Sequence, residues 1–329
     1  MVFWIIAGAV VLLFIAPALV LSAVLYTTLL VRTKPEKWGR ECSLPEDAEY
    51  KRMFDIGIAW NDVWKSRSRE VTITSDGFRL VGEYFDFGGK TAAIIIPGRM
   101  ESLLYSYYFA EPYRAAGCNV LVIDNRSHGL SEGRRCSLGY KEYRDLIRWS
   151  RLLTEELGNE RVVLHGICIG SSAALFALTS PDCPAGVAGM VADGMYPTFY
   201  ESFKNHMIED RRPLFPLLYA TMLWIRLLSG ANVVTDGPVK RIDRLTKPIL
   251  FLHSREDVYS LPKEAERLCS LCTADKELVW FDRGAHSRLR INAPEKYDAA
   301  IKSFIENKIE KESDQNVLHD LRRRDTRGL

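Results

Sequence analysis

Short apolar runs alternate along this chain with longer segments in which apolar residues recur every three or four positions. Two runs of alternating apolar and polar residues flank Ser75-Asp76-Gly77 and predict an antiparallel hairpin over residues 70–89. Further apolar runs predict buried strands at residues 91–98, 118–124, 161–165, 185–193, 248–254 and 276–282. Helical segments, among them residues 103–117 and 140–157, separate most of these runs. Because strands that alternate with helices pair in parallel, the pattern predicts an α/β fold, with a mostly parallel sheet covered by helices on both faces.

Residues 2–31 carry no charged side chain. About twenty apolar residues are enough to cross a bilayer as a helix. No basic segment precedes this run, and it is longer than the core of a secretory signal, so we expect a transmembrane anchor rather than a cleaved signal peptide. Basic residues follow at once, at Arg32, Lys34, Lys37 and Arg40. Since basic residues stay on the cytosolic side, we expect a single-pass protein of the cell membrane, with its N-terminus outside and its catalytic domain in the cytosol.

Three segments interrupt the alternation. Residues 32–66 predict a juxtamembrane linker, helical from about residue 45, and the pattern does not say whether it lies on the domain or on the membrane. Residues 196–240, after the sixth strand, combine aromatic and apolar residues at helical spacing. We interpret them as a helical lid that supplies an acyl pocket, the alternative being an extra layer of core helices. Residues 313–329 are charged and predict a solvated tail after a domain of residues 67–312.

Composition narrows the range of functions. The 44 basic and 42 acidic residues leave a net charge of +2, which gives no indication of nucleic-acid binding. Seven cysteines, an odd number without framework spacing, favour free thiols in a reducing compartment. Cys269 and Cys272 form a C-x-x-C pair, but no second pair exists and both lie in an amphipathic helical segment, so we expect no metal site there.

The segment Gly166-Ile167-Cys168-Ile169-Gly170 joins the strand at residues 161–165 to a helix-prone run that begins at Ser171. It has the spacing of the G-x-S-x-G nucleophile elbow, with cysteine in place of serine. The chain must turn sharply at the nucleophile, so glycine is needed two residues to either side. Cys168 then lies at a helix N-terminus, where the helix dipole favours a thiolate.

Four further motifs, in chain order around this elbow, resemble the α/β-hydrolase superfamily, in particular its lidded, membrane-anchored branch. IIIPGRMES (residues 94–102) resembles the oxyanion loop, although Pro97 stands where the family usually has histidine. VIDNRSHGLSEG (residues 122–133) resembles the D-x-R-G-H-G-x-S-x-G loop, with Ser127 in place of its first glycine. LFLHSREDVYSLP (residues 250–262) resembles the loop of the catalytic acid, and DRGAHSR (residues 282–288) that of the catalytic histidine.

The resemblance implies a catalytic triad of Cys168, Asp257 and His286. Glu256 and Asp193 are alternative acids, and His128 remains a candidate for the pocket wall only. The oxyanion would be bound by the backbone N–H of Ile169 and by that of Arg99 or Met100, in the loop after the third predicted strand.

Three functions are compatible with these residues. A cysteine nucleophile suits thioester chemistry, and we expect first a hydrolase, an esterase or thioesterase, that cleaves a small acyl ester or thioester through an acyl-cysteine intermediate. The alternatives are an acyltransferase that passes the acyl group to an amine or alcohol, and a non-catalytic membrane scaffold. The lid carries charged and polar residues that favour water at its mouth and therefore hydrolysis, namely Lys204, His206, Glu209, Asp210, Arg211 and Arg212. No metal or organic cofactor is expected.

Overall fold

The computed structural model describes residues 1–34 and 38–311. Its centre is an eight-stranded sheet in the order β1-β2-β4-β3-β5-β6-β7-β8. The strands are β1 (Ser68–Ser75), β2 (Phe78–Phe85), β3 (Thr91–Ile96), β4 (Asn119–Ile123), β5 (Arg161–Ile167), β6 (Val187–Asp193), β7 (Ile249–Ser254) and β8 (Lys276–Phe281). Strand β2 pairs antiparallel with β1 and β4, whereas β4, β3 and β5–β8 are parallel. The predicted hairpin and mostly parallel sheet are confirmed.

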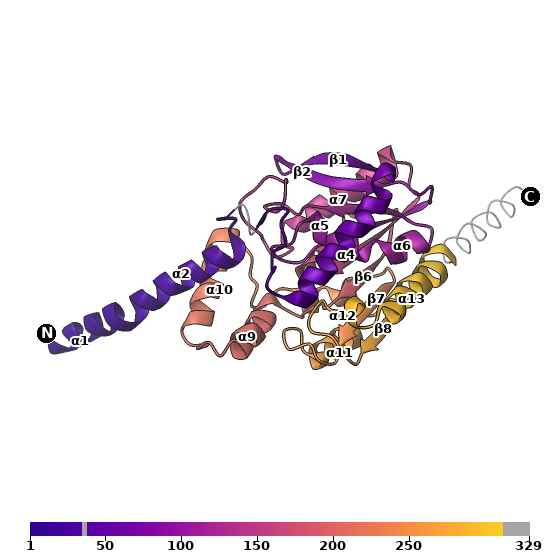
Figure 1. The fold of residues 1–329 in the computed structure, drawn as a ribbon. Coiled ribbons are helices and arrows are strands. Elements are labelled where there is room, and N and C mark those ends of the chain that lie inside the picture. Colours follow the sequence, from indigo (N-terminus) through magenta and orange to yellow (C-terminus); the bar gives the residue numbers. More distant parts are fainter. Residues whose placement is uncertain (35–37, 312–329) are drawn as a thin grey trace, which may run out of the picture.

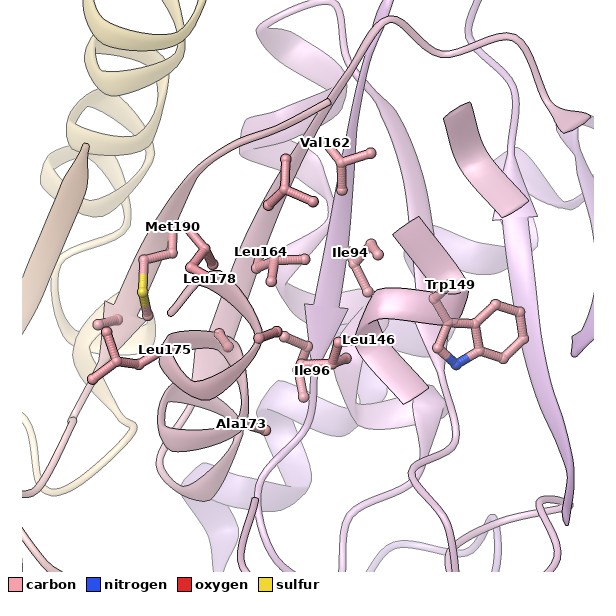
Figure 2. Close-up of a cluster of buried hydrophobic side chains, with 14 of the residues drawn as sticks. Ile94, Ile96, Leu146, Trp149, Val162, Leu164, Ala173, Leu175, Leu178 and Met190 are labelled. Atoms are coloured by element: carbon pink, nitrogen blue, oxygen red, sulfur yellow. The ribbon is translucent and has the colours of Figure 1, made fainter. Parts of the chain in front are cut away.

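Helices cover both faces of the sheet because the central strands are apolar on both sides. In β3, Ile94 and Ile96 face one core, with α7 (Glu142–Arg151), α8 (Ile169–Leu178) and α11 (Pro262–Leu271). Figure 2 shows Leu146 and Trp149 of α7 and Leu175 of α8 around the side chains of that face. Ala93 and Ile95 face the second core, which α6 (Glu111–Ala115) and α13 (Pro294–Phe304) cover.

The segment at residues 103–117 differs from the single helix that its pattern predicts. It consists of α5 (Leu103–Ser106), a 3₁₀ turn (Tyr107–Phe109) and α6. Pro112 occupies the first turn of α6 and has no N–H to continue a helix from upstream. The segment is therefore broken into short helical pieces, and Tyr105 and Tyr113 are both buried in the second core.

The apolar N-terminal run forms one long helical rod that projects away from the sheet (Figure 1). It comprises α1 (Val2–Val10), a π-helical turn (Val11–Ile15) and α2 (Ala16–Leu30). Within the described residues, one helix, Val11–Leu30, is long and apolar enough to cross a membrane. An N-terminal signal sequence passes the same test. The last turns of α2 reach the folded domain, where Ser22, Tyr26 and Leu30 are buried.

The linker lies against the domain. Helix α4 (Ala48–Trp64) begins at the N-cap Asp47, whose carboxylate accepts the N–H of Tyr50 at 2.9 Å. The Trp60 ring lies 4.9 Å from that of Phe85 in β2, and its Nε1 donates to Glu111 at 2.7 Å. Packing against β2 and α6 thus fixes α4 on the protein.

Between β6 and β7 the chain forms α9 (Phe199–Glu209) and α10 (Leu217–Ser229), followed by two short 3₁₀ turns (Pro238–Lys240 and Ile242–Arg244). These helices pack with the end of α2 around a third apolar cluster that includes Tyr26, Phe203 and Met222. The remaining described helical elements are a 3₁₀ turn after α4 (Lys65–Arg67), a π-helical turn after α7 (Leu152–Glu156), α12 (Leu289–Asn292) and a π-helical turn after α13 (Ile305–Glu310). The predicted tail at residues 313–329 lies outside the described residues.

Candidate active site

A sharp turn between β5 and α8 holds Cys168. Its backbone has φ of 53° and ψ of −112°, a conformation that L-residues rarely adopt. Side chains at the flanking glycines would not fit: a Cβ at Gly166 would lie 2.3 Å from the backbone of Gly170, and one at Gly170 would lie 2.4 Å from the carbonyl oxygen of Ile96. Backbone atoms therefore pack directly against both glycines. A turn of this shape requires glycine at these two positions, which is the spacing G-x-C-x-G.

His286 and Asp257 come from the loops after β8 and β7. The Nδ1 of His286 lies 2.7 Å from Asp257 Oδ2. The other carboxylate oxygen, Oδ1, accepts the N–H groups of Tyr259 at 2.9 Å and Ser260 at 2.8 Å. Backbone donors thus orient the carboxylate, and the carboxylate in turn orients the imidazole with its Nδ1–H donating.

His286 and Asp257 each shift the pKa of the other. Burial acts to lower the pKa of His286, but Asp257 and Cys168 together raise it well above its ordinary value. Burial acts to raise the pKa of Asp257, but the charge and hydrogen bond of His286 hold it below its usual value. The Nε2 of His286 is buried and has no hydrogen-bond partner in the described part of the chain. This nitrogen is available to exchange a proton with a group in the cavity.

The two alternative acids, Asp193 and Glu256, are hydrogen-bonded to groups other than His286. Asp193 Oδ2 accepts the hydroxyl of Tyr297 at 2.8 Å, and burial raises the pKa of Asp193 to about 7. Glu256 accepts the N–H of Gly284 at 3.1 Å. The carboxylate that is hydrogen-bonded to His286 is therefore that of Asp257.

In the loop after β3, the two alternative donors Arg99 and Met100 have different backbone hydrogen bonding. The N–H of Met100 donates to His128 Nε2 at 3.1 Å, so it is already engaged. Neither Arg99 N–H nor Ile169 N–H makes a hydrogen bond with residues 1–34 or 38–311. Ile169 is the first residue of α8, where backbone N–H groups have no partner within the helix. Arg99 and Ile169 are thus the free donors, and Met100 is not.

His128 is not part of the cavity lining, contrary to the sequence-based expectation. It is completely buried, and its Nδ1 lies 2.9 Å from the carbonyl oxygen of Arg126. That contact assigns the proton to Nδ1 and leaves Nε2 to accept from Met100. Burial lowers the pKa of His128 to about 4, so the ring stays neutral at pH 7 and positions the oxyanion loop.

The N-terminal segment supplies contacts that sequence reasoning missed. Ser43 Oγ donates to the carbonyl oxygen of Met100 at 2.6 Å, and Arg99 Nη1 donates to that of Leu29 at 3.3 Å. The Trp38 ring lies 4.8 Å from the ring of His128. Ser43 lies 57 residues from Met100 in the sequence, and Leu29 lies 70 residues from Arg99. No local sequence pattern indicates such pairings. The loop after β3 is thus fixed from both sides, by His128 and by the end of α2 with the segment around Ser43.

A cavity of about 330 Å³ contains Cys168 and His286. Its apolar wall comes largely from the lid and from the end of α2, with Tyr196, Phe199, Phe203 and Leu29. Charged groups also line it, namely Arg99, Glu101, Asp210, Arg212 and Arg288. Burial raises the pKa of Glu101 to about 7, although its carboxylate accepts the N–H of Gly98 at 2.7 Å. Of the charged and polar lid residues predicted at the mouth, His206, Asp210 and Arg212 line the cavity and the other three do not.

No group of three metal-ligating side chains occurs among the described residues. Cys269 and Cys272 are free thiols at the end of α11, and Cys272 is buried.

His128 offers a test of this arrangement by pH. Its pKa is lower folded than unfolded, so between about pH 6.5 and pH 4 the unfolded chain binds a proton that the folded chain excludes. We therefore expect the free energy of unfolding of the wild type to fall, relative to that of His128→Gln, as the pH falls through this range. The slope is up to about 1.4 kcal/mol per pH unit. Urea unfolding of both proteins in mild detergent measures it, and a difference independent of pH would contradict the buried neutral histidine.

Comparisons with known proteins agree with this architecture. Residues 92–220 match the family model described as the alpha/beta hydrolase fold. The chain is 29% identical over 216 residues to the uncharacterised protein YqkD of Bacillus subtilis, covering 65% of this chain and 70% of YqkD. Its structure is similar to that of the Pyrococcus furiosus esterase Pf2001, with a TM-score of 0.65 and 22% identity over 76% of this chain and 94% of that one. An alpha-beta hydrolase from Vibrio vulnificus has a TM-score of 0.55 and 19% identity over 75% of this chain and 86% of that one.

The strand order and the similarity to these solved structures show that the chain has an α/β-hydrolase fold. In this chain the residue at the turn between β5 and α8 is a cysteine, Cys168.

Proposed function

We propose that this protein is a membrane-anchored hydrolase that cleaves a carboxylic ester or thioester through an acyl-cysteine intermediate. One observation carries the proposal. Cys168, on a strained turn at the N-terminus of α8, shares a cavity with His286, whose Nδ1 is bonded to Asp257. The Nε2 of His286 has no hydrogen-bond partner among residues 1–34 and 38–311. Nucleophile, base and orienting carboxylate are the three groups that acyl transfer requires.

In the first half-reaction the sulfur of Cys168 attacks the acyl carbonyl carbon. The thiol proton goes to Nε2 of His286, and the carbonyl oxygen becomes an oxyanion bound by the N–H groups of Ile169 and Arg99. The tetrahedral intermediate collapses when the bond from carbon to the leaving oxygen or sulfur breaks. His286 then returns the proton to that leaving group, so Cys168 is left acylated and His286 neutral.

In the second half-reaction water attacks the acyl-cysteine. His286 Nε2 takes a proton from the water, and the oxyanion forms in the same place. Collapse releases the carboxylic acid and restores the thiol of Cys168. The polar groups of the cavity, including Glu101 and Arg288, support the presence of water at this step.

The helix Val11–Leu30 supports the anchor, and Arg32 and Lys34 directly after it favour a cytosolic domain. The contacts that Leu29 and Leu30 make with the domain support a helix that stays attached to it. A cleaved signal peptide would leave the third apolar cluster without Tyr26 and Leu30.

The product formed from a thioester donor in the absence of any acceptor tests the proposal. We expect steady multiple turnover with free acid as the product, because the cavity admits water to the acyl-cysteine. Stopped-flow thiol release and product analysis measure this. A burst of one equivalent, followed by acyl release only after addition of an amine or alcohol, would indicate an acyltransferase instead. No thiol release from a panel of acyl chain lengths would favour the non-catalytic scaffold.

A further inference from the structure

Helix α10 has an apolar face that residues 1–34 and 38–311 leave uncovered. Tyr219, Leu223 and Leu227 are four residues apart, form one stripe along the helix and are exposed, with Leu227 64% accessible. Phe215, just before α10, is 80% accessible. The opposite side of the helix packs into the lid through Leu218, Met222 and Ile225. A stripe of large apolar side chains on the outside of an already packed helix indicates a surface for another apolar phase.

The same helix lies against the apolar N-terminal rod (Figure 1). Trp224 Nε1 donates to the carbonyl oxygen of Leu19 at 3.2 Å and to Ser22 Oγ at 3.1 Å. From Leu19 to Leu30 a helix rises about 16 Å, so α10 flanks the last third of the apolar rod rather than its end alone. Val20 and Val24 of α2 are exposed and line one hollow together with Trp224 of α10, so the apolar surface of α2 adjoins α10. If the rod spans a bilayer, that bilayer extends to α10.

Cations gather where the two helices end. The N–H of Arg32 donates to the carbonyl oxygen of Arg134 at 2.8 Å, and Arg135 Nη1 donates to that of Leu228 at 3.4 Å. The side chains of Arg134, Arg135 and Lys141 line an open hollow beside Leu228. In the described part of the chain no carboxylate forms an ion pair with any of these three side chains. Glu132, an exposed acid in the same hollow, accepts the N–H of Arg79.

We propose that the surface formed by Phe215, Tyr219, Leu223 and Leu227, which we term the lid face, docks on the lipid bilayer that holds the N-terminal helix. The apolar stripe then lies among acyl chains, and Arg134 and Arg135 lie at the level of the phosphates of anionic lipids. The inference rests on the proposed anchor and defines a substrate class for the proposed function. Leu29 of α2 and Phe203 of α9 line the cavity, so its apolar wall adjoins the docked surface. The ester or thioester is accordingly an amphiphile held in the membrane.

Tryptophan fluorescence of the full-length protein in vesicles of brominated phosphatidylcholine and phosphatidylglycerol tests the lid face directly. Leu223→Trp adds a fluorophore at an exposed position of the stripe. Val63→Trp is the matched control, because Val63 is 67% accessible and lies at the C-terminal end of α4, away from the rod. Relative to the wild type, we expect the added emission of Leu223→Trp to be quenched severalfold and that of Val63→Trp to be unchanged. Replacement of Arg134 and Arg135 by alanine should reduce the quenching of Leu223→Trp. If the quenching is the same with and without these two replacements, the assignment of the two arginines to anionic lipid is overturned.

Carbonate extraction of the same samples separates this inference from the anchor on which it rests. Protein that resists extraction while Leu223→Trp stays unquenched would retain the anchor and overturn the docked lid face. A concentration-dependent blue shift of that unquenched emission would assign the face to a second copy of this chain. Release of the wild type by carbonate would overturn the anchor and the docking together. None of these readouts depends on turnover, so the proposed hydrolase activity is tested independently.

Discussion

Cys168→Ala is expected to abolish turnover, with kcat reduced on the order of 10⁴-fold or more. Alanine keeps the Cβ that the strained turn already accommodates, so the fold should persist while the sulfur that forms the acyl bond is gone. Initial rates on a thioester donor, measured beside the thermal unfolding midpoint, separate loss of chemistry from loss of structure.

Cys269→Ala is the matched control for this experiment. Cys269 is a free, half-buried thiol on α11 and is not part of the cavity lining. Its replacement should leave kcat unchanged. Comparable activity of Cys168→Ala and the wild type would show that another group attacks the acyl carbon.

Asp257→Asn is expected to reduce kcat by about 10³- to 10⁴-fold, since loss of this carboxylate allows the wrong histidine tautomer. The asparagine amide can donate to Nδ1 of His286 and place the proton on Nε2, which then cannot accept one from the thiol. Because Asp257 raises the pKa of His286, and His286 must be neutral to accept the thiol proton, loss of Asp257 should also move the acidic limb of the pH–rate profile to lower pH.

Glu256→Gln is the control for this charge change. Glu256 is the adjacent carboxylate and accepts only the N–H of Gly284, a role that the glutamine carbonyl can fill. We expect near wild-type rates and an unshifted profile. A larger loss in Glu256→Gln than in Asp257→Asn would reverse the assignment of the acid.

The sheet and the turn at Cys168 could be predicted because their causes are local. Six buried residues in β3 are enough to indicate a central strand, and two glycines around Cys168 indicate a turn with no room for side chains. The loops of Asp257 and His286 could be placed only through the family resemblance. The spacing of these two loops along the sequence does not show that they lie side by side. The parallel pairing of β7 with β8 shows it, because it brings the carboxyl ends of the two strands together.

The support of the oxyanion loop could not be predicted. Met100 and Arg99 looked equivalent in the sequence, and only the position of His128, 28 residues away from Met100, shows that one N–H is engaged. The contacts of α2 with Arg99 and Trp224 join segments 70 and 202 to 205 residues apart. The composition of the apolar helix predicts an anchor, whereas the place of its Leu29 in the cavity wall depends on tertiary packing alone.

Mass spectrometry of the protein, acid-quenched within one turnover of a thioester donor, tests the central claim most directly. The account predicts an acyl adduct that maps to the peptide carrying Cys168, forms before free acid appears and decays as the acid accumulates. It also predicts no adduct on the same peptide in Cys168→Ala. Release of acid from the wild type with no adduct at any time, or with an adduct on a different residue, would contradict it.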